Sequence, residues 1–205
     1  MKLILFDTLD LFVGLVILAC LLFVIWRRGR SLPYLLFFSV FWMYLLVVVS
    51  KVVLPIVIGL NDSNAAFSPD INLVPFQYAA CSMPARCAAE VIQNMLLTVP
   101  FGFGINFLLR VKPRSLVWLA PATGLALELA QLAVTVIFKS HFHVFDINDV
   151  ISNGLGVLIG YAIFRVFAWG YVKLADHLGL TQQWLLADIY AVASSPQDPR
   201  RSKSA

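Results

Sequence analysis

Residues 115–138 read SLVWLAPATGLALELAQLAVTVIF, a continuous apolar stretch in which Glu128 is the only charged residue. About 20 apolar residues are enough for an α-helix to cross the hydrocarbon core of a bilayer. A charge at the centre of such a helix costs roughly 2.5–3.5 kcal/mol, so Glu128 is expected to have a partner or a function. Further polar residues end this stretch and begin the next one: Gln131, Asp146, Asp149 and Asn153.

The composition of the whole chain points to the same class of protein. Of its 205 residues, 60% are hydrophobic and 13% are charged, and the mean hydropathy is +0.86. Soluble domains have roughly 45–50% apolar and 25% charged residues, so a multi-pass membrane protein is the class that fits. The net charge of +4 does not indicate a nucleic-acid partner, because the basic residues lie beside apolar segments and form no single patch.

Five apolar stretches are long enough to span a membrane, which predicts an all-α fold, a polytopic bundle of about five transmembrane helices. The first is not a signal peptide, because Arg27 and Arg28 stand where a cleavage site should be. We expect residues 1–174 to form the bundle, residues 175–193 an interfacial helix, and residues 194–205 a disordered basic tail. The predicted spans are Leu9–Trp26, Leu32–Ile58, Val91–Leu109, Ser115–Phe138 and Val150–Ala168.

Basic residues are concentrated in alternate connections between these spans. By the positive-inside rule those connections face the cytoplasm, which puts the N-terminus outside and the C-terminus in the cytoplasm. We therefore expect a multi-pass protein whose partner is the lipid bilayer of a bacterial cytoplasmic membrane. The residues on the predicted cytoplasmic side are Arg27, Arg28, Arg30, Arg110, Lys112, Arg114, Arg165, Lys173, Arg200, Arg201 and Lys203.

Helical spacing places the polar residues of three spans in stripes that begin at the outer boundary of the membrane. Glu128 and Gln131 share one face of the fourth span, Asp149 and Asn153 share one face of the fifth, and Asn94 lies near the outer end of the third. These stripes predict a polar cavity that is open to the outside. The alternative is that the same residues only form hydrogen bonds between helices.

Two pairings are suggested by the residues on the outer side. Lys51 lies in an otherwise apolar part of the second span and needs a carboxylate, so we hypothesise an ion pair with Glu128 or Asp149. Cys81 and Cys87 lie in a loop predicted to face an oxidising space, where a disulfide competes with the alternative of two free thiols.

Four short motifs in this order resemble the VanZ-like family of membrane proteins. They are NLVPF at 72–76, QNMLLTVPFG at 93–102, ELAQ at 128–131 and DINDVISNGLG at 146–156. The resemblance implies a VanZ-like core at about 70–168, and it adds Asn72 to the candidate site. It also implies a place in the cell envelope and a link to resistance against glycopeptides such as teicoplanin.

One departure from the family pattern concerns the residues before Asp146. Family members commonly carry an arginine there, whereas this chain reads HFHVF at 141–145. If that arginine binds an anion, His141 or His143 would replace it only when protonated.

Three functions are compatible with the sequence. The favoured one is a non-catalytic envelope protein that binds a lipid or glycopeptide in the outward-facing cavity. The second is an enzyme on a lipid-linked substrate with Glu128 or Asp149 as acid or base, and the third is a lipid transporter or flippase. His141, His143, Asp146 and Asp149 could hold a divalent metal, but interfacial histidines are the simpler interpretation. We expect neither a metal nor another cofactor.

Overall fold

The computed structural model describes residues 2–4, 6–54, 56–58, 67–77, 84–139, 144–179 and 184–195. In these residues the chain is an all-α bundle, as predicted, and five helices are long and apolar enough to cross a membrane. The orientation of the termini relative to the membrane stays a prediction. The helices are α1 (Thr8–Arg27), α2 (Leu32–Val52), α3 (Pro84–Leu109), α4 (Leu116–Phe138), α5 (Ile147–Leu178) and α6 (Trp184–Ser194), with a 3-10 turn, η1 (Pro113–Ser115), before α4.

Two short strand pairs were not predicted from the sequence. β1 (Lys2–Ile4) pairs antiparallel with β2 (Ile56–Ile58), and β3 (Ile71–Asn72) pairs parallel with β4 (Phe145–Asp146). Strands of two or three residues are too short to give the alternating pattern by which strands are recognised in a sequence. The second pair matters for the candidate site, because it joins the segment before α3 to the start of α5.

Three predicted spans have different bounds in the structure. The third was expected to begin at Val91, but α3 already begins at Pro84. The second was expected to reach Ile58, but α2 stops at Val52, three residues before Pro55, which has no backbone N–H to continue a helix. The fifth was expected to end at Ala168, but α5 has 32 residues and reaches Leu178, where Gly179, with a φ of 64°, forms the C-cap. At 1.5 Å per residue α5 is about 48 Å long, which exceeds a hydrocarbon core of about 30 Å.

The interfacial helix expected at residues 175–193 is consequently not one continuous helix. Residues 175–178 belong to α5, and the last helix, α6, begins at Trp184. Most of the expected tail, residues 196–205, lies outside the described residues.

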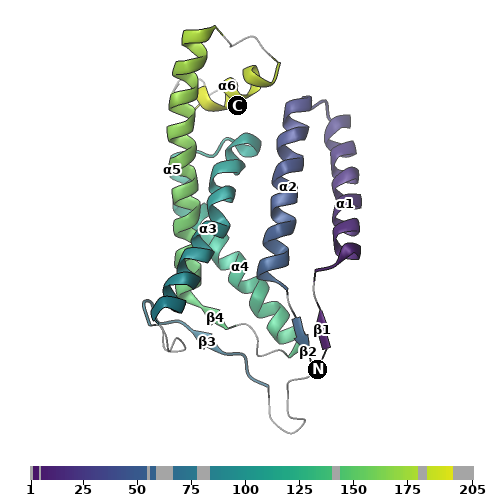
Figure 1. Ribbon diagram of the computed structural model, residues 1–205, viewed down its shortest axis with the longest axis vertical. Coiled ribbons are helices and arrows are strands. Elements are labelled where there is room, and N and C mark those ends of the chain that lie inside the picture. The colour runs from purple at the N-terminus through teal and green to yellow at the C-terminus, as the bar shows by residue number, and fades with distance from the viewer. Residues whose placement is uncertain are drawn as a thin grey trace.

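The centre of the bundle is α5, which packs closely against α3 and α4 (Figure 1). Its glycines allow the close approach to α3, since a Cβ at Gly156 or Gly160 would overlap the α3 backbone at Met95 and Val99. In return, a Cβ at Gly102 of α3 would overlap the α5 backbone at Val157. Small residues at such contacts are typical of packed membrane helices.

The bundle has two chemically different ends (Figure 1). At one end, here called the strand end, lie β1 to β4, the beginnings of α3 and α5, and the end of α4. At the opposite end, here called the α6 end, lie the α1–α2 turn, the connection from α3 to α4, and α6. There α6 buries Val192 and Ala193 against the aromatic residues Tyr161 and Phe164 of α5.

Candidate ligand site at the strand end

Asp146 starts α5 and is the first anchor of the site. It is the N-cap residue, and its Oδ1 accepts hydrogen bonds from the backbone N–H and the side-chain Nδ2 of Asn148, both at 2.8 Å. An aspartate at this position satisfies an N–H group that the helix itself leaves unpaired. The carboxylate is thereby held at the boundary of the fifth span, which is where the sequence predicted a polar site.

Asn72 connects this anchor to the segment 71–77. Its Nδ2 donates to Asp146 Oδ2 at 3.1 Å and to the carbonyl oxygen of Gln77 at 2.9 Å. Its Oδ1 accepts from the backbone N–H of Val74 at 3.1 Å, so the side chain also closes its own turn. Both polar atoms of this amide are used, which assigns Asn72 a holding role beside Asp146.

Asn148 fixes the same segment from α5 and was not among the residues selected from the sequence. It is only 4% exposed, and its Oδ1 accepts from the backbone N–H of Phe76 at 2.6 Å. Its Nδ2 also donates to the Gln77 carbonyl at 3.2 Å. Phe76 has a φ of 61°, a conformation that is unfavourable for an aromatic residue, so the turn depends on these contacts. The Asp-x-Asn spacing at a helix start was the available signal for Asn148.

Glu128 of α4 is bonded to the same network and is buried, with 1% of its surface exposed. Its Oε2 accepts a hydrogen bond from the backbone N–H of Asp146 at 3.2 Å, which ties α4 to the start of α5. The charged groups that act on it are Asp149 and Asp146, so its surroundings are acidic. The carboxylate expected to need a partner therefore has a backbone N–H as that partner.

Asp149 and Asn94 form the half-buried rim of the site. The Asn94 side chain on α3 hydrogen-bonds the Asp149 carboxylate on α5, and Glu90, one turn earlier on α3, adds a further acidic charge nearby. Both residues of the bonded pair are partly accessible, in contrast to Glu128. This rim offers carboxylate and amide oxygens at the end of the bundle.

Three further predicted site residues lie at the edge of this group or away from it. Asn153 is 3% exposed, its Oδ1 is recorded without a hydrogen-bond partner, and its backbone carbonyl accepts from Thr98 Oγ1 at 2.7 Å. Gln131 is half-buried on α4. Lys51 is exposed in the last turn of α2, and no ion pair from it to Glu128 or Asp149 is recorded in the described residues, so that pairing stays a prediction.

Some of the proposed ligands and pairings involve residues that the structure does not describe. His141, His143 and Cys81 lie outside the described residues. Cys87 is disulfide-bonded and Cys20 is a free thiol, but the predicted Cys81–Cys87 pairing itself stays a prediction. Within the described ranges no group of three or more His, Cys, Asp or Glu side chains is arranged to hold a metal ion.

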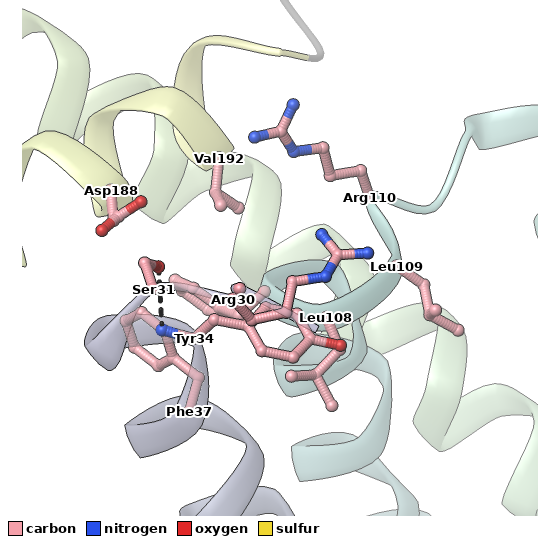
Figure 2. A pocket seen from close by; sticks show the side chains of 11 residues that line it. Arg30, Ser31, Tyr34, Phe37, Leu108, Leu109, Arg110, Asp188 and Val192 are labelled. Carbon is pink, nitrogen blue, oxygen red and sulfur yellow. Dashed lines mark hydrogen bonds between the residues drawn. The ribbon is translucent and has the colours of Figure 1, made fainter. Parts of the chain in front are cut away.

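Glu128 is packed inside the bundle and does not itself face an open space, and the predicted outward-facing cavity at this end stays a prediction. A cavity at the α6 end has a volume of about 460 Å³ and is lined by Arg30, Arg110 and Asp188 among others (Figure 2).

Comparison with known proteins decides the family. The VanZ/LLP1 family model matches residues 41–168, which is more than half of the chain. The chain belongs to the VanZ/LLP1 family. The match runs from the middle of α2 to Ala168 of α5, and so it begins earlier than the core expected from the sequence. It includes every residue of the Asn72, Asp146, Asn148 and Glu128 network. No curated protein and no solved structure matches the chain.

Five apolar helices together with this family make the chain a multi-pass membrane protein.

Proposed function

We propose that this VanZ-family protein binds an envelope lipid or a glycopeptide at the strand end, on the outer face of a bacterial cell membrane. We further propose that this binding links it to glycopeptide antibiotic resistance. The observation that carries the proposal is the rim formed by Asp149 and Asn94 in front of the buried Glu128. Polar groups of this kind are rare in membrane helices and usually face a pathway or a cavity.

The chemistry of the rim defines the ligand class. Carboxylates only accept hydrogen bonds, so they favour ligands rich in hydroxyl or ammonium donors. The sugars and amines of a glycopeptide have such donors, and so does the sugar of a lipid-linked envelope precursor. The Oδ1 of Asn153, one helical turn beyond Asp149, is buried and is not part of this rim.

A binding role fits the roles of the carboxylates better than a catalytic one. Both oxygens of Asp146 accept bonds from Asn72 and Asn148, and Glu128 holds the backbone of Asp146. These groups therefore position the start of α5. One observation favours the enzyme as a second candidate: two carboxyl groups, Glu128 buried and Asp149 half-buried, lie at the same end of the bundle, as an acid and a base of one site would.

Native mass spectrometry of the purified protein with added teicoplanin tests the proposal. Asp149→Asn keeps the size of the side chain and removes a charged acceptor, so we expect occupancy by teicoplanin to fall roughly tenfold. Asp70→Asn is the matched control, because Asp70 is an exposed acid before β3 and should leave occupancy unchanged. Equal occupancy in all three proteins would contradict glycopeptide binding at this rim.

The same samples incubated with envelope lipid extract separate the remaining ligands. A bound lipid that is lost in Asp149→Asn and retained in Asp70→Asn supports lipid binding at the rim. Conversion of an added lipid to a species of different mass, abolished by Glu128→Gln, would support the enzyme instead. Expression of the wild type and of Asp149→Asn in a susceptible bacterial strain then tests resistance, which we expect only from the wild type.

A further inference from the structure

The α6 end contains a cavity that plays no part in the site at the strand end. Its volume is about 460 Å³, and three separate parts of the chain form its walls. These are the α1–α2 turn with the beginning of α2, the end of α3, and α6 (Figure 2). Because α6 closes one side, the cavity exists only when that helix is packed against α5.

Two arginines give the cavity its charge. Figure 2 shows the side chains of Arg30, just before α2, and Arg110, just after α3, on the same side of the space. The guanidinium of Arg30 lies over the ring of Tyr34, with its carbon 5.1 Å from the ring centroid, which fixes its direction. In the described part of the chain neither guanidinium is recorded in an ion pair with a carboxylate. Their charges are therefore available to a ligand.

The beginning of α2 adds to the attraction for an anion. Ser31 is the N-cap of α2 and lines the cavity, so the positive end of the helix dipole points toward it. Asp188 of α6, which Figure 2 shows near Ser31, contributes one carboxylate to the lining. That carboxylate repels a doubly charged phosphate, but it accepts a hydrogen bond from a hydroxyl group beside a singly charged phosphodiester.

The remaining walls of the cavity are apolar. Phe37 of α2 and Phe107 of α3 are stacked with their ring centroids 4.6 Å apart, and both line the space. Leu109, in the last turn of α3, also lines it and is 69% exposed. Cationic groups next to an exposed apolar wall suit a molecule with both a phosphate and hydrocarbon chains. A free phosphate would contact the cationic groups but not the apolar wall.

We propose that this cavity binds the headgroup of an anionic glycerophospholipid whose phosphodiester lies beside a hydroxyl group. Arg30 and Arg110 hold the phosphate, Asp188 accepts from the headgroup hydroxyl, and the acyl chains leave along Leu109. Basic pockets between membrane helices recognise anionic headgroups in this way. The predicted cytoplasmic location of these arginines agrees with the leaflet that attracts basic residues, although the binding chemistry does not depend on it.

Native mass spectrometry with phosphatidylglycerol added to the full chain in detergent tests the proposal. We expect the Arg30→Gln/Arg110→Gln double variant to bind this lipid at least roughly tenfold more weakly than the wild type. Arg114→Gln is the control, because Arg114 is a basic residue of the same end that does not line the cavity. Equal loss in the control and in the double variant would show that general surface charge binds the lipid, and it would overturn the proposal.

Two further arms keep the proposal testable if the double variant folds poorly. Asp188→Asn should reduce the preference for phosphatidylglycerol over phosphatidylmethanol, an anionic phospholipid whose headgroup has no hydroxyl donor, and an unchanged preference contradicts the assigned role of Asp188. In the wild type, inorganic phosphate at millimolar concentration should not displace phosphatidylglycerol. Full displacement would identify a free-phosphate site and overturn the assignment to a lipid.

Discussion

At the strand end, Glu128, Asp146 and Asp149 accept hydrogen bonds from a backbone N–H and from amides of neighbouring segments. At the α6 end, Arg30 and Arg110 line a cavity and are recorded without a carboxylate partner in the described residues. The carboxylates of the strand end accept hydrogen bonds that hold neighbouring segments together, whereas the two arginines of the α6 end line an open space. The comparison teaches that a buried charged group does not by itself mark a ligand site. Where its hydrogen-bond partners are groups of the protein, the charged group has a structural role.

The largest expected effect comes from the helix contact that supports both ends. Gly160→Val would force a side chain into the α3 backbone at Val99, so we expect a loss of at least about 3 kcal/mol and failure to fold in most of the protein. Gly170→Val is the control, since nothing lies within 4 Å of a Cβ there. Size-exclusion chromatography in detergent measures both variants. A well-folded Gly160→Val protein would show that the two ends do not depend on the α3–α5 contact.

The next effect should be confined to the strand end. Asn148→Ala removes the acceptor of the Phe76 N–H and the donor to Gln77, so we expect a loss of about 2–3 kcal/mol. Hydrogen–deuterium exchange should accelerate in residues 72–77 and stay unchanged in α6. Gln77→Ala is the control, because only the backbone of Gln77 is used. Equal acceleration at both ends would remove the distinction between them.

A smaller effect is expected from Glu128, and it depends on the replacement. Glu128→Gln keeps an oxygen that can accept from the Asp146 N–H and should change stability by less than about 0.5 kcal/mol, whereas Glu128→Leu should cost about 1–2 kcal/mol. Thermal unfolding in detergent measures both variants. If the leucine variant is as stable as the glutamine variant, the hydrogen bond to Asp146 does not hold α4 to α5.

The smallest destabilisation that should still be detectable lies at the α6 end. Tyr171→Phe removes the hydrogen bond from the Tyr171 hydroxyl to the Leu186 carbonyl, at 3.0 Å, and should loosen α6 by about 0.5–1 kcal/mol. Faster proteolysis of α6 with unchanged exchange at residues 72–77 is the expected result. A change at residues 72–77 would instead mean that the two ends are coupled.

The helices of this fold were predictable and their exact ends were not. Hydropathy alone identified all five spans, because each is a long apolar stretch. It could not give the end of α5, since Trp169 to Leu178 continues as a helix beyond the length that a membrane requires. The strands β3 and β4 are two residues long, which is below what any sequence pattern can indicate.

The candidate site was predictable in its residues but only partly in its connections. Helical spacing brought Glu128, Asp149 and Asn94 toward one end, and the structure places them there. Spacing cannot show that Glu128 accepts from a backbone N–H, because every residue except proline has that donor. The cavity of Arg30, Arg110 and Asp188 joins residues about 80 apart in the sequence, and no local pattern connects them.

A crossed binding measurement tests most directly the central claim that the two ends are separate sites. Teicoplanin and phosphatidylglycerol would each be titrated into the wild type, Asp149→Asn and Arg30→Gln/Arg110→Gln, with native mass spectrometry as the readout. We predict that Asp149→Asn weakens teicoplanin alone and that the double arginine variant weakens phosphatidylglycerol alone. Weakening of both ligands by either variant, or of neither ligand by both, would contradict the claim.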